Sequence, residues 1–215
     1  MIVSLLLAAA LLQTSDVTEP NTGVRFPTEL QTAAGSQELT GTGVRTRTFL
    51  KVKVYAFGLY VNQAGARAAL GPWRGKSAGD LARDQALYNE LLKGEFPMTL
   101  RLVMTRDVGG DQMASAFSEA LEPRVAQAEQ RGMSGGAAAL TQFRGFFGSD
   151  LKNGTELVFA RSGGKLTVSI GGQQVGEIDN PALGWALFDV YLGPKPISED
   201  GKKTVVSRLP GILGA

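Results

Sequence analysis

The sequence predicts an α+β fold, in which helices pack on one face of a mostly antiparallel β-sheet. Segments that alternate apolar and polar residues at the period of a β-strand occur early in the chain and again after residue 155. Segments with a helical spacing of apolar residues lie between these two groups. The glycine pairs at 163–164 and 171–172 separate the late strands by turns short enough to join antiparallel neighbours. This grouping favours helices layered on one antiparallel sheet.

The early strand segment covers residues 44–61 and alternates most regularly around its lysines. Lys53 falls on one face of the strand and Val54 on the other, and Tyr55 continues the lysine face. The segment is too long for one ordinary strand of about 5 to 6 residues. We therefore expect a tight hairpin near positions 49–50.

The remaining elements follow from apolar spacing and from cap and turn residues. In chain order we expect a helix capped by Ser77 that ends at Gly94, a strand over 98–105, a helix from Asp111 onward, a short helix over 137–147, strands over 156–161, 165–170 and 173–178, a helix from Pro181 to Gly193, and a last helix that is capped by Ser198 and runs toward Arg208.

The chain contains no histidine and no cysteine, which excludes several classes of enzyme and metal site. Catalytic triads and dyads that need an imidazole base or a thiolate nucleophile are impossible. Disulfides, zinc sites and iron-sulfur clusters held by cysteine are excluded as well. We expect no metal and no cofactor, and the remaining options are oxygen and nitrogen chemistry or binding alone.

Charge and length indicate a single globular domain without affinity for nucleic acid. The 22 Lys and Arg residues against 20 Asp and Glu residues give a net charge of +2 over 215 residues. The basic residues are scattered, whereas nucleic-acid binding needs a clustered basic face. The sequence carries no prediction of the oligomeric state.

Residues 2–12 form an uncharged apolar run that is followed by a polar stretch. The run is shorter than the ~20 residues that span a bilayer, but it suits the apolar region of a signal peptide. We therefore expect residues 1–15 to be a signal peptide, residues 16–215 to form the domain, and the protein to be periplasmic or secreted, with no stable membrane span after cleavage. A buried first strand or helix is the alternative, since no Lys or Arg precedes the run.

Arg45 and Tyr55 are the candidate binding residues that the strand pattern indicates. Arg45 begins a strand that becomes buried, and Tyr55 returns on the paired strand. A guanidinium offers a planar fork of donors that suits a carboxylate, and a tyrosine hydroxyl could share that oxygen. An ion pair with a surface acid would explain Arg45 equally well, and simple packing would explain Tyr55.

Four stretches of the chain resemble the chalcone isomerase superfamily, and in particular its bacterial chalcone isomerase-like branch. They are GVRFP at 23–27, GTGVRTRTFLKVKVYAFGLYV at 41–61, ALFDVYLGPKPIS at 186–198 and SRLP at 207–210. The resemblance implies an open-faced β-sandwich, in which a large curved antiparallel sheet is covered by a layer of helices with an apolar cleft between them. It agrees with the α+β prediction.

The resemblance also assigns roles to individual positions. The guanidinium that activates the substrate of the isomerases corresponds to Arg45, and their strand threonine corresponds to Tyr55, as in fatty-acid-binding members. Their helix tyrosine, asparagine and threonine correspond to Met113, Ala120 and Val190. The arginine is thus kept, while polar groups that would position a polyphenol are replaced by apolar ones.

These substitutions favour a non-catalytic protein that binds a fatty acid or a similar apolar carboxylate. Arg45 and Tyr55 would anchor the carboxylate. The candidate wall residues, which could equally be ordinary core residues, are Met113, Phe117, Leu187 and Val190. An isomerase or lyase that acts on a chalcone-like enone with Arg45 as electrophile is an alternative, and a structural or partner-binding module of the cell envelope is another.

Overall fold

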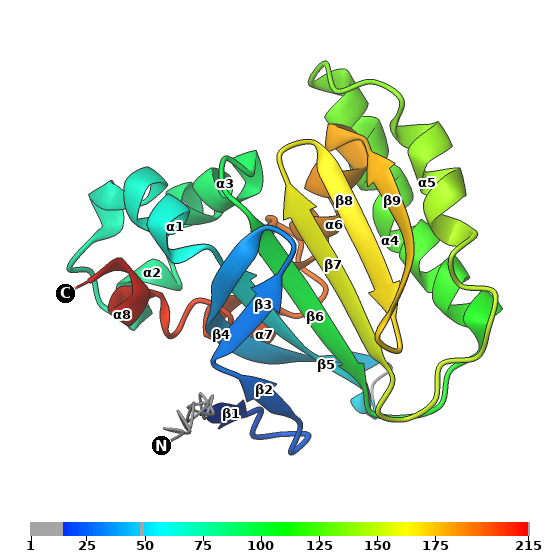
Figure 1. Ribbon diagram of the computed structural model, residues 1–215, viewed down its shortest axis with the longest axis horizontal. Helices are drawn as coiled ribbons and strands as arrows, with labels where there is room; N and C mark the ends of the chain where they lie inside the picture. The colour runs from blue at the N-terminus through cyan, green and yellow to red at the C-terminus, as the bar shows by residue number, and fades with distance from the viewer. Residues whose placement is uncertain (1–14, 48–49, 215) are drawn as a thin grey trace, which may run out of the picture.

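The fold is a curved seven-stranded antiparallel sheet with helices on one side, as a computed structural model that describes residues 15–47 and 50–214 shows (Figure 1). The strands lie in the sheet in chain order, and each pairs antiparallel with the next. They are β3 (Glu29–Thr32), β4 (Gly35–Arg47), β5 (Val52–Val61), β6 (Met98–Met104), β7 (Glu156–Ser162), β8 (Lys165–Ile170) and β9 (Gln173–Asp179). The α+β prediction is confirmed.

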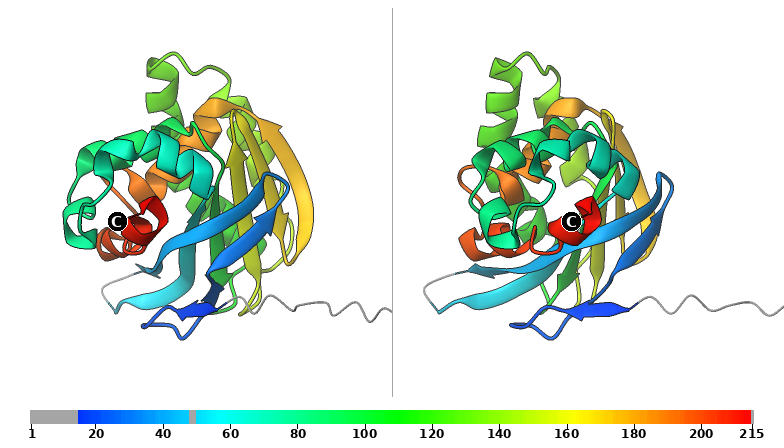
Figure 2. Two further views of the ribbon diagram at one scale, coloured as in Figure 1. Left: turned by 60° about the vertical axis from the view of Figure 1, so that its left-hand side comes forward. Right: turned by 90° about the vertical axis from the view of Figure 1, so that its left-hand side faces the viewer.

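The helices gather on one side of this sheet, which Figure 2 shows from two directions. They are α1 (Gln63–Ala69), α2 (Ala78–Leu81), α3 (Gln85–Lys93), α4 (Gly110–Gln130), α5 (Gly136–Arg144), α6 (Pro181–Leu192), α7 (Glu199–Thr204) and α8 (Leu209–Leu213), with a 3-10 turn at Gly71–Trp73. Helix α6 is buried at every position after Pro181 and packs against α3, α4, α5, α7 and β8. Because it is apolar at nearly every position, it forms the centre of the core.

The other face of the sheet carries a smaller apolar cluster that the sequence did not predict. A short hairpin of β1 (Asp16–Thr18) and β2 (Arg25–Pro27) lies against this face. Phe26 of β2 is fully buried, and the Arg101 guanidinium lies 5.1 Å from the centre of its ring. Arg101 also forms a salt bridge with Glu156. Strand β6 is therefore buried on both faces although its sequence alternates.

Strands β4 and β5 form the predicted hairpin, and residue 49 of its tip lies outside the described residues. Arg45 pairs with Tyr55, but Thr46 pairs with Lys53, so that Val54 is an extra residue in β5. Such a bulge turns two successive side chains toward the same face. Tyr55 therefore lies with Val54 on the helix side of the sheet. The prediction that Tyr55 shares the face of Lys53 was wrong, because it assumed an uninterrupted alternation.

One predicted helix is divided in the structure, and another ends earlier than predicted. Ser77 caps a helix as expected, but α2 ends at Leu81, and Asp84 starts α3 by accepting hydrogen bonds from the amides of residues 86 and 87. An aspartate caps a helix better than it continues one. The helix after Ser198 stops at Thr204, because the Arg208 amide donates to the Thr40 carbonyl of β4 at 2.7 Å.

Gly43 of β4 and Gly201 of α7 lie in direct contact, which lets the helix rest on the strand. A Cβ atom at Gly43 would come within 2.7 Å of the Gly201 Cα and 2.6 Å of the Phe57 ring. We expect Gly43→Ala to lower the free energy of unfolding by about 1 to 3 kcal/mol, because backbone and ring must both shift. Urea unfolding would measure it, with Gly211→Ala as a control where an added Cβ meets no atom within 4 Å. Equal stability of the two variants would show that α7 is not held this tightly.

Within residues 15–47 and 50–214, no helix is both long and apolar enough to cross a membrane. The proposed signal peptide falls almost entirely on residues 1–14, outside the described residues, and remains a prediction.

Candidate functional site

A cavity of about 330 Å³ opens between the β4–β5 hairpin, the start of α4 and the loop after α6. Most of its lining is apolar and comes from β5, from the segment that joins β6 to α4, from α4 itself and from the loop. The apolar lining residues are Val52, Val54, Val108, Met113, Ala116, Phe117, Ala120 and Ile197. Its volume lies near the lower end of the ~300 to 1,000 Å³ that small-molecule sites occupy.

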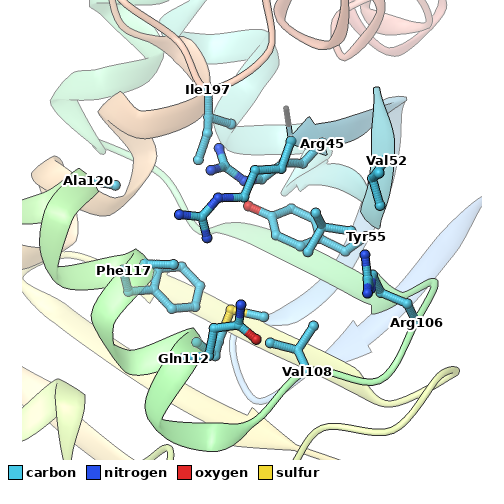
Figure 3. Close-up of a pocket in the computed structure, with 13 residues that line it drawn as sticks. Arg45, Val52, Tyr55, Arg106, Val108, Gln112, Phe117, Ala120 and Ile197 are labelled. Carbon is cyan, nitrogen blue, oxygen red and sulfur yellow. The ribbon is translucent and has the colours of Figure 1, made fainter. Parts of the chain in front are cut away.

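Arg45 and Tyr55 form a polar end of this cavity, as the sequence suggested. The two residues pair in register across β4 and β5, and Figure 3 shows their side chains side by side, across the cavity from Phe117 of α4. Arg45 is partly buried, and no salt bridge or side-chain hydrogen bond of Arg45 occurs among the described residues. The surface acid of the alternative explanation is therefore not found within residues 15–47 and 50–214.

The Tyr55 hydroxyl lies 3.0 Å from the Tyr191 hydroxyl of α6, in a fully buried contact. Burial raises the pKa of Tyr55, and the Arg45 charge and the Tyr191 hydrogen bond offset this only partly. Burial also raises the pKa of Tyr191 well above its usual value. Both phenols are therefore protonated at neutral pH and available as hydrogen-bond donors.

Three further polar residues, which the sequence analysis did not identify, line the cavity. They are Arg47, Arg106 and Gln112, and all three are exposed at its mouth. Arg47 could have been found, because it lies two residues after Arg45 on the same strand and shares its face. Arg106 and Gln112 could not, because only the folding of β6 and α4 brings them to the hairpin.

The structure brings four of the six candidate residues together. The four that line the cavity are Arg45, Tyr55, Met113 and Phe117. The other two, Leu187 and Val190 of α6, are buried in the hydrophobic core and do not line the cavity. The loop after α6 folds back on the end of this helix, where the Ile197 amide donates to the Val190 carbonyl at 2.7 Å. Ile197 thus forms the wall on that side.

The lining residues suit the binding of an anion more than proton transfer. The described part of the lining contains no acidic residue, and neither arginine nor a tyrosine with a raised pKa can act as a general base at neutral pH. Nor do the described residues include any group of three or more acidic side chains placed to hold a metal ion.

The Tyr55 and Tyr191 hydroxyls should depend on each other for stability. We expect Tyr55→Phe or Tyr191→Phe alone to cost about 1 to 3 kcal/mol, because each leaves the other buried hydroxyl without a partner. The double variant should cost less than the sum of the two. A double-mutant cycle from urea unfolding checks this, and additive effects would mean that each hydroxyl has another partner.

Known proteins with similar sequences include both ligand-binding proteins and enzymes. Fatty-acid-binding protein 2 of Arabidopsis thaliana is 31% identical over 206 residues, which are 91% of this chain and 51% of that protein. The chain thus spans about half the length of this relative. A chalcone–flavanone isomerase of Oryza sativa subsp. japonica is 29% identical over 189 residues, with 82% of this chain and 81% of the enzyme covered.

A solved structure and a family model agree with these relatives. The crystal structure of a fatty-acid-binding protein from Arabidopsis thaliana matches with a TM-score of 0.77 at 22% identity, over 93% of this chain and 99% of that one. This match confirms the chalcone isomerase-like fold that the resemblance implied. The family model described as chalcone isomerase like matches residues 36–206. With most of its length matched in this way, the chain belongs to the chalcone isomerase-like family.

Proposed function

We propose that the protein binds a fatty acid or a similar apolar carboxylate without transforming it. The observation that carries the proposal is the cavity itself, which is apolar along its walls and has a guanidinium without a described acidic partner beside a protonated tyrosine at one end. Burying each methylene of an alkyl chain contributes about 0.8 kcal/mol. The relative named fatty-acid-binding protein 2 supports the same reading.

The carboxylate would receive hydrogen bonds from Arg45 and from Tyr55. If the Tyr191 hydroxyl donates to the Tyr55 oxygen at 3.0 Å, the Tyr55 proton is free to point into the cavity. Tyr191, which does not line the cavity, is then a positioning residue. A charged group that accepts two such bonds is held more strongly than a neutral one.

The size of the cavity favours a medium-length chain. Its volume of about 330 Å³ lies near the lower end of the range of small-molecule sites, which suits a shorter ligand better than a long one. Decanoate is a suitable probe of this size. Turnover of a chalcone is the competing function, but the walls offer Met113 and Ala120, which cannot pair with the hydroxyl groups of a polyphenol.

Titration of the delipidated protein with decanoate, followed by calorimetry, tests the proposal. We expect saturable binding that is lost in Ala120→Phe, because the added ring occupies the cavity from α4. Ala138→Phe on the exposed surface of α5 is the matched control and should bind normally. No binding by the wild-type protein, or turnover of a chalcone that Arg45→Ala abolishes, would refute non-catalytic carboxylate binding.

A further inference from the structure

Arg47 and Arg106 give the mouth of the cavity more positive charge than a carboxylate needs. Arg45 and Arg47 come from β4, whereas Arg106 follows β6. Figure 3 shows Arg106 at the edge of the cavity near Val52 and the Tyr55 ring. Three arginines from two parts of the chain therefore line one cavity, although the whole chain carries a net charge of only +2.

Within the described residues, neither Arg47 nor Arg106 forms a salt bridge. The acid nearest to Arg106 in the chain is Asp107, and its carboxylate is already engaged. It accepts a hydrogen bond from the Asn153 amide at 2.8 Å and lies 3.4 Å from the Lys152 ammonium group. Other arginines of the chain are paired, such as Arg124 with Asp189 at 2.9 Å. The positive charge at the mouth is thus not balanced by these acids.

We propose that the same cavity also binds, and prefers, an amphiphile whose head group carries two negative charges, of the phosphate monoester class, and that Arg47 and Arg106 bind its outer oxygens. The inference rests on the proposed function, because it needs the apolar cavity and Arg45 at its inner end. A carboxylate has one charge, which Arg45 alone can neutralise. A phosphate monoester carries about −1.5 to −2 at pH 7 and has three acceptor oxygens, which suits several guanidinium forks.

The head group would lie at the mouth, with its chain directed inward along the apolar walls. Arg45 is partly buried, whereas Arg47 and Arg106 are exposed, so the positive charge extends from the inside of the cavity to solvent. A planar carboxylate held by Arg45 and Tyr55 would leave the two outer arginines without a function in binding. A tetrahedral phosphate can reach inward and outward at once.

Titrations with decyl phosphate and decanoate, which share one chain, test the proposal. We expect the wild-type protein to bind decyl phosphate about tenfold more tightly, and the double variant R47Q/R106Q to lose that preference while its affinity for decanoate changes less than about threefold. The control R74Q/R144Q removes the same charge at two exposed arginines that do not line the cavity. Its preference should stay as in the wild type.

The pH dependence of the affinity shows whether the ligand or the protein is the group that titrates. The second proton of a phosphate monoester has a pKa near 6, and the chain has no histidine. Affinity for decyl phosphate should therefore rise between about pH 6 and 7.5, where the carboxyl group of decanoate is already ionised and affinity for decanoate should stay nearly constant. Binding of inorganic phosphate as tight as that of decyl phosphate would show a simple anion site and overturn the proposal.

The outcomes also distinguish this proposal from the simpler one. Equal affinity for the two ligands, with decanoate binding lost in Ala120→Phe, overturns the phosphate inference and leaves the carboxylate function intact. If R47Q/R106Q and R74Q/R144Q lose the same affinity for both ligands, the arginines act only by general attraction between charges. That result also overturns the phosphate inference. If neither ligand binds, both proposals fail.

Discussion

Replacing Arg45 by glutamine is expected to lower the affinity for decanoate by about tenfold to a hundredfold. A hydrogen bond to a charged group contributes about 1.5 to 3 kcal/mol, and every 1.4 kcal/mol corresponds to a factor of ten. Arg45 is the cationic lining residue that is partly buried, so its bond is less weakened by solvent than those of Arg47 and Arg106. Calorimetric titration of the delipidated variant measures the change.

Two controls make this result specific to the anchoring of the carboxylate. Decanol has the same chain without the charge, and its affinity should differ little between the wild type and Arg45→Gln. Arg74→Gln removes an exposed arginine that does not line the cavity and should bind decanoate like the wild type. A loss for decanol as large as that for decanoate would mean that the substitution disturbs the cavity, and unchanged decanoate binding would remove the anchor.

The protein is expected to unfold cooperatively above about pH 11 at 25 °C. All four tyrosines of the chain are buried, and burial raises the pKa of each, to about 12 for Tyr88. Three of their hydroxyls have buried hydrogen-bond partners: Tyr55 and Tyr191 pair with each other, and Tyr88 donates to the Lys202 carbonyl. Loss of the hydroxyl proton would break or weaken these hydrogen bonds. The folded state therefore keeps protons that the unfolded chain releases.

The sign of this effect follows from the direction of the shifts. A group whose folded pKa is raised contributes its full stability below its unfolded pKa, near 10, and that stability is lost as the pH rises through the folded value. Each protonated tyrosine costs up to about 1.4 kcal/mol for every pH unit above 10, against a total stability of about 5 to 15 kcal/mol. Burial lowers the pKa of Arg161 to about 10 and also lowers the pKa of Lys202, and both act in the opposite direction, but they are two groups against four.

Absorbance of tyrosinate and far-UV circular dichroism, followed together from pH 8 to 13, would measure this transition. The two signals should change in one step, since the tyrosines ionise as the chain unfolds. The variant that combines Tyr55→Phe and Tyr191→Phe retains half of the tyrosines and should unfold at a higher pH. Ionisation of all four tyrosines near pH 10 in a folded protein would contradict their burial.

Most of the secondary structure could be predicted from the sequence, because local signals determine it. The Asn180 side chain accepts from the Leu183 amide and starts α6, and Gly94 ends α3 with a φ of 74°. The short strands near the amino terminus were missed, since β2 is only three residues long and is stabilised by burial of Phe26 against the sheet. Strands of this length have no usable period.

The residues of the candidate site were likewise predicted only where local structure determines their position. The sequence predicted that Arg45 and Tyr55 lie on paired strands, because a hairpin is a local structure, but their direct pairing depends on the bulge at Val54. Leu187 and Val190 share the helical spacing of Met113 and Phe117, but a helix buried on all sides presents no distinguishable cavity face in its sequence. Which apolar residues line a cavity depends on the neighbours that cover them.

The sequence by itself determined that the chain forms an antiparallel sheet with helices, that it has no imidazole or thiol chemistry, and that an arginine and a tyrosine lie on the two strands of one hairpin. Only the tertiary structure decided that the bulge at Val54 turns Tyr55 into the cavity, that Tyr191 reaches its hydroxyl from 136 residues away, and that Arg106 joins Arg45 and Arg47 at the opening. The physical reason is that periodicity records the faces of single elements, whereas a binding site is made where the faces of several elements meet.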